Sequence, residues 1–289
     1  MNAINPGFMQ GRLSPLVDGK IQAFPSTCWQ EEFGTAVDLG FDQMEWTLDH
    51  IGLMNNPLLS REGRSDIRRH SRRSGIKVTS VTMDCVMQAP FHKTKGALQH
   101  GLLEDFTAVV EACAAAKIKT LVFPLVDDGS LDSQQDEAEL KKGLDIVLPV
   151  LTRNQMRIAF ESDFAPDKLA DFLSNYPEDI FGLTYDIGNS AASGFRPSDE
   201  FDAYGERIIH VHIKDRIKGG STVPPGEGDA CFEDVFRLLA ETDYDGDYIL
   251  QTARADDDDH AGVLKKYRDM AITWHDKARS ETLASGSAI

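Results

Sequence analysis

Cysteines and long apolar runs are both scarce in this sequence. Four cysteines occur in 289 residues, with no CxxC pair and no dense disulfide framework, so we expect reduced thiols. No segment approaches the ~20 apolar residues of a membrane-spanning helix. The opening MNAINPGFMQGRL also lacks the apolar stretch of a signal peptide. These absences predict a cytoplasmic protein with no membrane partner.

Basic residues are also few relative to acidic ones. The chain has 30 basic and 47 acidic residues, and its formal net charge is −17. Such a surface repels nucleic-acid backbones and anionic lipids, so neither is an expected partner. A small anionic substrate stays open, because a few local arginines can override the overall field within a cleft.

Short β-type runs alternate with longer amphipathic runs along the whole chain. The strand candidates are NPGFMQGR, FDQMEWTL, IKVTSVTMD, IKTLVFPL, MRIAFESD, GLTYDIG, IIHVHIKD and DYILQTAR. Helical patterns cover residues 29–39, 60–73, 98–116, 133–151, 166–174, 199–204, 232–241 and 261–277. Strands that alternate with helices in this way predict a parallel sheet.

A parallel sheet can close into a barrel or stay open. An open sheet usually carries a phosphate-binding G-x-G-x-x-G after its first strand, and the first strand here runs into Gln10-Gly11-Arg12 without such a loop. We therefore predict a single-domain (β/α)₈ TIM barrel over residues 1–278. Residues 279–289 are small and polar, and we expect them to form a flexible tail.

Four consecutive strand-like runs near the C-terminus each end in a side chain that can bind a metal. They are Glu161 in MRIAFESD, Asp186 in GLTYDIGN, His212 in IIHVHIKD and Gln251 in DYILQTAR. Successive gaps of 25, 26 and 39 residues are each about one strand–helix unit, so the four are expected to meet at one rim of the barrel. Two carboxylates, an imidazole and an amide oxygen suit one divalent cation.

Each of these residues also has a purely structural interpretation. Glu161 by itself fits an acid at a helix N-terminus or a surface ion pair, and Asp186 fits a cap on the Gly188–Asn189 turn. His210 lies on the same strand face as His212 but one layer deeper, which is typical of a hydrogen-bonded core histidine. It is the recurrence at four successive strand ends that favours chemistry.

Other polar side chains at strand ends are candidates for binding a substrate. They are Gln10, Arg12, Glu45, Lys214, Arg216 and Arg254. Guanidinium groups suit phosphate and carboxylate, although a surface ion pair is an equally good explanation for any single arginine. Residues 214–222 form a basic, Gly-rich loop after the seventh strand, where barrels often bind a phosphate. A flexible turn is the simpler alternative.

Several of these segments resemble a known family. FESD, YDIGN, HVHIKDR, the opening GFMQGRLSP and the run from PPGEGDACF to DYDGDY are similar to the xylose-isomerase-like TIM-barrel superfamily, and more closely to its sugar-phosphate isomerases and epimerases. The resemblance covers residues 5–275 and is most specific in the second half. It implies a barrel that acts on a small sugar or sugar phosphate.

The resemblance also implies a metal site. Members bind one divalent ion, commonly Mn²⁺, Mg²⁺ or Co²⁺, through Glu, Asp, His and Glu, which correspond here to Glu161, Asp186, His212 and Gln251. Zn²⁺ is a further candidate for this chain. The fourth position departs from the usual Glu, and Asn189 stands where ketose epimerases often have a histidine. Endonuclease IV, a distant relative, needs many more histidines, so a nuclease is not expected.

The expected chemistry passes through an enediolate, with Glu161 as the base that removes a proton. An amide cannot move protons at neutral pH, so epimerisation would need another acid in place of Gln251; Glu45 and Lys214 are candidates. Two alternatives stay open: a lyase of the inosose-dehydratase type and a non-catalytic sugar-binding barrel. An acidic barrel with a long Ala-rich helix is also compatible with a homodimer.

Overall fold

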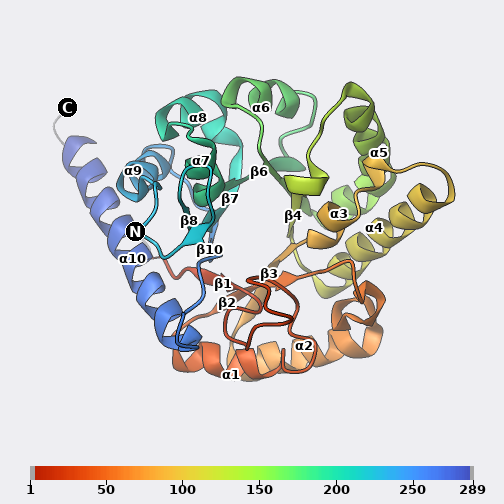
Figure 1. Cartoon of the computed structure of the whole chain (residues 1–289), viewed down its shortest axis with the longest axis horizontal. Helices are drawn as coiled ribbons and strands as arrows, with labels where there is room; N and C mark the ends of the chain where they lie inside the picture. Colours follow the sequence, from red (N-terminus) through yellow and green to blue (C-terminus); the bar gives the residue numbers. More distant parts are fainter. Residues whose placement is uncertain (1–3, 287–289) are drawn as a thin grey trace.

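Eight parallel strands form a closed barrel in the computed structural model, which describes residues 4–286 (Figure 1). Around the ring the order is β1 (Gly7–Met9), β10 (Asp247–Leu250), β7 (Ile208–Ile213), β6 (Phe181–Asp186), β5 (Arg157–Ser162), β4 (Thr120–Leu125), β3 (Lys77–Thr82) and β2 (Gln43–Thr47). All eight predicted strands are present. The predicted closed (β/α)₈ barrel is confirmed.

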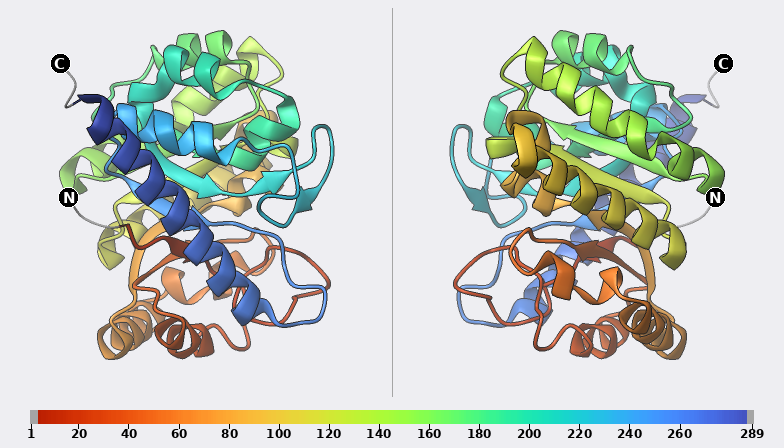
Figure 2. Two further views of the ribbon diagram at one scale, coloured as in Figure 1. Left: turned by 90° about the vertical axis from the view of Figure 1, so that its left-hand side faces the viewer. Right: turned by 90° about the vertical axis from the view of Figure 1, so that its right-hand side faces the viewer.

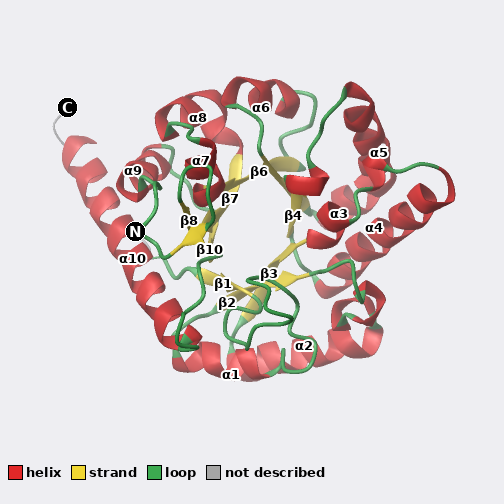
Figure 3. Cartoon of the chain, in the orientation of Figure 1, coloured by secondary structure: helices red, strands yellow, loops and turns green. Residues whose placement is uncertain are grey.

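Helices form an outer ring around the strands (Figure 3). They are α1 (Glu31–Asp38), α2 (Arg61–Ser74), α4 (Gly96–Ala116), α5 (Gln134–Asn154), α6 (Pro166–Leu173), α8 (Pro197–Tyr204), α9 (Phe232–Glu241) and α10 (His260–Gly286). None of the helices within residues 4–286 combines the length and the apolar character needed to cross a bilayer.

Two short helices were not predicted. They are α3 (Asp84–Gln88), which follows β3, and α7 (Ile187–Ser193), which follows β6. Segments of five and seven residues are too short to show a helical period in the sequence. Both lie inside the helix ring, near the centre of the view in Figure 1.

The last helix is longer than the sequence indicated. The pattern predicted a helix over residues 261–277 and a tail from 279, whereas α10 runs without a break to Gly286. Residues 279–286, placed in the tail by the sequence, are therefore helical. Residues 287–289 of that tail lie outside the described part of the chain.

An apolar layer fills the space between the strands and the helices. Phe160 of β5 stacks on Phe181 of β6 at 5.7 Å and meets Phe123 of β4 edge-on at 6.0 Å. These three rings are buried. Side chains alternate along a strand, so the outward positions carry this core and the inward positions of the same strands point into the barrel.

The inside of the barrel is polar. Strands β2 and β7 are separated in the ring by β1 and β10, yet Glu45 of β2 contacts both His210 and His212 of β7. These side chains therefore meet across the lumen. The barrel interior holds charges, and charges buried this deeply must be paired.

Glu32 of α1 is a second buried carboxyl group, placed beneath the loop that follows β1. It is fully buried and accepts hydrogen bonds from the backbone N–H groups of Gly11 (2.9 Å) and Leu13 (3.0 Å). Burial raises the pKa of Glu32 to about 7, although both backbone hydrogen bonds act in the opposite direction. The carboxyl group thus holds its proton more tightly in the folded chain than in the unfolded one.

We expect the Glu32→Gln variant to lose less stability than the wild type between pH 5 and pH 8. The unfolded chain releases the Glu32 proton first, so the wild-type free energy of unfolding should fall by roughly 2–3 kcal/mol across this window through this group. Glutamine has no proton to lose. Urea unfolding at pH 5, 6.5 and 8 measures the effect, with the exposed neighbour Glu31→Gln as a control. Identical pH slopes for the Glu32 variant and the wild type would contradict it.

Candidate metal and substrate site

Three of the predicted metal ligands come together at the carboxyl ends of neighbouring strands. Glu161 is the second-last residue of β5, Asp186 is the last residue of β6, and His212 lies on β7, where it pairs in register with Asp186. One potential ligand atom from each lies within 4.8 Å of the other two, and all three residues are buried. Strand register in a closed parallel barrel therefore brings side chains 25 and 26 residues apart to one point.

Asp186 uses its two oxygens for different purposes. Oδ1 accepts the backbone N–H of Asn189 at 2.8 Å and caps α7. Oδ2 lies 3.1 Å from Lys214 Nζ and 3.8 Å from His212 Nδ1. Burial alone would raise the pKa of Asp186, but Lys214 and His212 outweigh it and hold the pKa below its ordinary range. The turn-capping interpretation and the ligand interpretation are thus compatible.

Glu161 is oriented by Asn189. The Asn189 Nδ2 donates to Glu161 Oε1 at 2.6 Å, while Oε2 lies 3.5 Å from His212 Nδ1. With only 5% of its surface exposed, Glu161 is neither a surface ion pair nor a free acid at a helix end. The asparagine thus directs one carboxylate oxygen towards the centre of the site.

Gln251, the fourth residue predicted as a ligand, directly follows β10. Its Oε1 accepts a hydrogen bond from Lys214 Nζ at 3.3 Å, and its Nε2 donates to Gln22 Oε1 at 2.9 Å. Lys214 Nζ also donates to Asn189 Oδ1 at 3.1 Å. The Gln251 amide oxygen therefore faces the same ammonium group as Asp186, and Gln22 determines which way the amide points.

Glu45 lies beneath His212 in the lumen. It is fully buried, and its carboxylate lies 2.7 Å from His210 Nε2, 2.9 Å from His212 Nε2 and 2.6 Å from Ser80 Oγ. Burial alone would raise the pKa of Glu45, but the two histidines hold it well below its usual range. Conversely, burial lowers the pKa of His212, but Glu45, Asp186 and Glu161 raise it well above its ordinary value.

This arrangement determines which nitrogen of His212 faces the site. Nε2 donates to the Glu45 carboxylate, which leaves Nδ1 directed at Glu161 and Asp186. A carboxylate behind a ligating histidine is a common way of fixing the ring of that histidine. His210 contacts Glu45 from the deeper layer, in the position expected of a core histidine.

The donor set fits a divalent cation. His212 Nδ1 is buried without a hydrogen-bond partner and faces the carboxylates of Glu161 and Asp186. The Gln251 amide oxygen contacts the same Lys214 ammonium group as Asp186. Oxygen donors with one imidazole are suitable ligands for ions such as Mg²⁺, Mn²⁺ or Zn²⁺. A bound cation would give Nδ1 its partner and would replace the proton that the carboxylates favour on the ring.

A cavity of about 390 Å³ opens beside these ligands. Its walls include Gln22, Asp84, Glu161, Lys214, Arg216 and Gln251. The volume lies within the range of small-molecule sites, and the lining is rich in hydrogen-bonding groups. Such a cavity is suited to a small, polar molecule.

Three of the residues predicted to bind a substrate make hydrogen bonds to other parts of the chain. Arg12 donates to the carbonyl oxygens of Thr252 (3.0 Å) and Ile21 (2.7 Å), and Arg254 donates to those of Gly11 and Ser14. These two side chains link the loops after β1 and β10. Gln10 accepts the backbone N–H of Thr47 from within the barrel, at 3.1 Å. Among the described residues, the lining of the cavity includes none of the three, nor Glu45.

The Gly-rich loop after β7 is a short hairpin. Strands β8 (Asp215–Arg216) and β9 (Thr222–Val223) pair antiparallel and project from the body of the molecule (Figure 2). Arg216 Nη1 donates to Asn189 Oδ1 at 2.9 Å and so faces the site. Asp215 is fully buried and accepts three backbone N–H groups, from residues 226, 228 and 230, so it holds the following loop in place.

Asp84 and Gln22 are two hydrogen-bonded polar residues of the cavity that the sequence analysis did not single out. Asp84 is 7% exposed, and its Oδ2 accepts a hydrogen bond from Gln22 Nε2 at 2.6 Å. Burial raises the pKa of Asp84 to about 7, and the nearby carboxylates of Asp49 and Glu161 add to the effect. A signal was available, because Asp84 is the last residue of the strand-like run IKVTSVTMD, as the ligands are near the ends of theirs. Gln22 lies in a loop and had no such signal.

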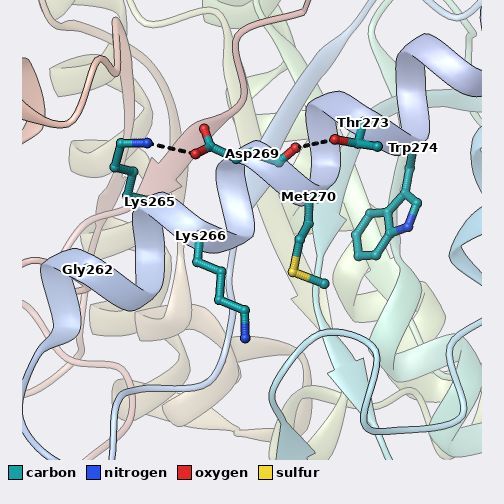
Figure 4. Close-up of a pocket in the computed structure, with 7 residues that line it drawn as sticks. All are labelled: Gly262, Lys265, Lys266, Asp269, Met270, Thr273 and Trp274. Carbon is teal, nitrogen blue, oxygen red and sulfur yellow. Dashed lines mark hydrogen bonds and ion pairs between the residues drawn. The ribbon is translucent and has the colours of Figure 1, made fainter.

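A second hollow lies on the outside of the barrel, along α10 (Figure 4). Its lining residues all come from that helix, and they include Met270, Trp274 and the ion pair between Lys265 and Asp269 (2.7 Å). Both groups of candidate metal ligands in the described part of the chain lie inside the barrel instead. The barrel mouth is therefore the candidate site.

Comparisons with known proteins agree with this architecture. The sequence profile of the xylose isomerase-like TIM barrel family matches residues 33–270. The chain is 26% identical over 250 residues to the L-ribulose-5-phosphate 3-epimerase UlaE of Escherichia coli O1:K1, covering 84% of this chain and 88% of the relative.

Solved structures show the same fold. A xylose isomerase domain protein from Planctomyces limnophilus superposes with a TM-score of 0.75 at 14% identity, covering 96% of this chain and 100% of the other. A xylose isomerase-like TIM barrel protein from Mycobacterium smegmatis, solved in complex with magnesium, gives 0.67 at 16% identity, covering 95% and 97%. The chain belongs to the xylose isomerase-like TIM barrel family.

Proposed function

We propose that this chain is a divalent-metal-dependent isomerase or epimerase of a sugar or sugar phosphate, with Glu161 as the proton-transfer base. One observation supports the proposal most directly. Glu161, Asp186 and His212 present ligand atoms within 4.8 Å of one another beside a polar cavity. The activity in the name of the relative UlaE, a 3-epimerase of a sugar phosphate, is consistent with it.

In the proposed reaction, four side chains bind the metal ion and one of them, Glu161, also removes a proton. A divalent ion held by Glu161, Asp186, His212 and Gln251 would polarise a carbonyl group and its neighbouring hydroxyl group. Glu161 would take the proton from the carbon between them, with its Oε1 held by Asn189 at 2.6 Å. The substrate would thereby become an enediolate.

Lys214 and Arg216 supply positive charge beside this centre. Lys214 is held by Asp186 at 3.1 Å, and Arg216 by Asn189 at 2.9 Å, so both cations are positioned before a substrate arrives. Preorganised charge of this kind stabilises negative charge that develops on the substrate oxygens. The same two side chains could bind a phosphate group.

Solvent deuterium incorporation tests the proposal. The purified protein would be incubated in deuterated buffer with Mn²⁺ or Mg²⁺ and, in turn, L-ribulose 5-phosphate, D-fructose and further ketoses, aldoses and their phosphates. We expect NMR to show loss of one carbon-bound proton in one or a few of these sugars. The product would then distinguish an isomer from an epimer.

Two results would overturn the proposal. Loss of water with a new carbonyl product would identify a lyase. Sugar binding without exchange of any carbon-bound proton, with metal present, would identify a non-catalytic sugar-binding barrel.

A further inference from the structure

Epimerisation at this site lacks an evident second acid. Glu161 can remove a proton from one face of a carbon, but inversion requires a proton donor on the other face. Gln251, across the ligand set, carries an amide that transfers no proton at neutral pH. Glu45, a sequence candidate for this task, lies in the lumen with its carboxylate occupied by two histidines and Ser80.

The cavity offers few other groups that can hold and release a proton. Its ionisable lining residues are Asp84, Asp127, Glu161, Asp163, Lys214 and Arg216. Asp127 and Asp163 are exposed to solvent. The Lys214 ammonium is bound by three oxygens, those of Asp186, Asn189 and Gln251.

Asp84 differs from these groups in its placement. It is the first residue of α3, two positions after the end of β3, and it is 7% exposed. It lines the same cavity as Glu161, and β4 separates β3 from the strand of Glu161. Gln22 bridges it to Gln251, because Gln22 Nε2 donates to Asp84 Oδ2 at 2.6 Å and Gln22 Oε1 accepts from Gln251 Nε2 at 2.9 Å. A carboxyl group is thus fixed beside the amide that cannot transfer protons.

We propose that Asp84 is the second proton-transfer residue, which delivers a proton to the face of the enediolate opposite Glu161. The inference rests on the proposed function of the site. It assigns that function more narrowly to epimerisation, with one carboxyl group on each side of the sugar.

Glu161 and Asp84 account for every proton transferred in this reaction, so no further reactant is needed. Glu161 takes the proton of a C–H bond, whose electron pair becomes the C=C bond of the enediolate while the carbonyl pair moves to oxygen. Asp84 then gives its O–H proton to the other face of that carbon. The C=C pair forms the new C–H bond and the carbonyl group returns. Glu161 ends protonated and Asp84 ionised, and proton exchange with solvent resets both.

Burial is consistent with this role. It raises the pKa of Asp84 to about 7, so near neutral pH part of the folded population holds the proton that the step requires. The carboxylates of Asp49, Glu161 and Glu45 also raise the pKa of Asp84, and the Gln22 hydrogen bond opposes them. The Arg12 guanidinium attracts the ionised Asp84 and acts in the same direction as that hydrogen bond.

The test separates epimerisation from proton exchange in the Asp84→Asn variant. With L-ribulose 5-phosphate or D-fructose, whichever the wild type converts, we expect epimer formation to fall at least about 100-fold. Deuterium should still enter the unreacted sugar, because Glu161 can return a solvent-derived deuteron to the face from which it took the proton. Asp128→Asn, at an exposed aspartate that is not part of the cavity lining, is the matched control and should change neither rate.

Stability supplies a readout that does not depend on turnover. The raised pKa of Asp84 makes the wild type less stable as pH rises from about 4 to about 7. The Asn variant should therefore gain thermal stability relative to the wild type at pH 8 and not at pH 4. Binding of Mn²⁺, measured by calorimetry, should be retained. A folded variant with these properties cannot have lost its epimerase activity through unfolding.

Other outcomes overturn the inference in distinguishable ways. Epimer formation at the wild-type rate in Asp84→Asn would remove Asp84 from the reaction, as would equal loss of exchange and epimer formation. A wild type that forms only an aldose would remove the need for a second acid but keep the proposed isomerase. No exchange by the wild type with any sugar would end the proposed function itself.

Discussion

Replacing Glu161 with glutamine is expected to reduce exchange of the substrate's carbon-bound proton by about 10²–10⁴-fold or more, to the limit of detection. Glutamine preserves the size of the side chain and can still accept the Asn189 hydrogen bond through its amide oxygen. It cannot take up a proton. The variant therefore separates the base from the other ligands, Asp186 and His212, which remain in place.

The measurement is deuterium incorporation by NMR, with Mn²⁺ binding measured in parallel. We expect the Glu161→Gln variant to bind the ion, because Asp186 and His212 remain and the new glutamine offers an amide oxygen at position 161. Glu178→Gln, an exposed glutamate, is the matched control and should behave like the wild type. Exchange that persists in the Glu161 variant would show that another group is the base.

The Glu45→Ala variant should show the largest loss of stability, about 3–5 kcal/mol in the free energy of unfolding. Glu45 is fully buried, and its removal leaves His210, His212 and Ser80 without their shared acceptor inside the barrel. Losing one member of a buried charge pair costs more than losing an exposed pair, because the partner stays buried.

Urea unfolding at pH 7 measures this loss, and Ser80→Ala provides a graded comparison. That variant removes only the Ser80 hydrogen bond and leaves both histidine contacts with Glu45 in place, so it should cost about 1 kcal/mol. Weaker metal binding is a second expected result for Glu45→Ala, because Glu45 orients the His212 ring. If Glu45→Ala lowers the free energy of unfolding no more than Ser80→Ala does, the barrel interior tolerates unpaired histidines and the prediction is wrong.

The strands could be predicted from the sequence because their signal is local. Each run of apolar and β-branched residues spans only seven to nine positions, and the absence of a Gly-rich loop at Gln10-Gly11-Arg12 favoured a closed barrel. The helix boundaries were harder to predict, because a helical pattern is also read locally and needs at least one full period. The short α3 and α7 carry no complete period, and polar residues beyond position 277 concealed the continuation of α10.

The candidate ligands could be found because position along a strand determines the rim at which a side chain emerges. Glu161, Asp186 and His212 occupy equivalent places in three neighbouring strands, so parallel register brings them together. Asp84 obeys the same rule and was missed because it stands alone, 77 residues before Glu161, outside the recurring series. Arg12 and Arg254 also follow strands, but their partners are backbone carbonyls that no residue pattern reveals.

By itself, the sequence determined the eight-strand barrel and the side chains that its strands present at the carboxyl end, since both depend on periodicity and spacing. Only the tertiary structure decided what those side chains touch. Glu45 and His212 are 167 residues apart and meet because the ring closes. Gln22 joins Asp84 to Gln251 because a loop folds over the barrel mouth. Contacts across a lumen or between loops depend on the geometry of the closed fold, which no local pattern encodes.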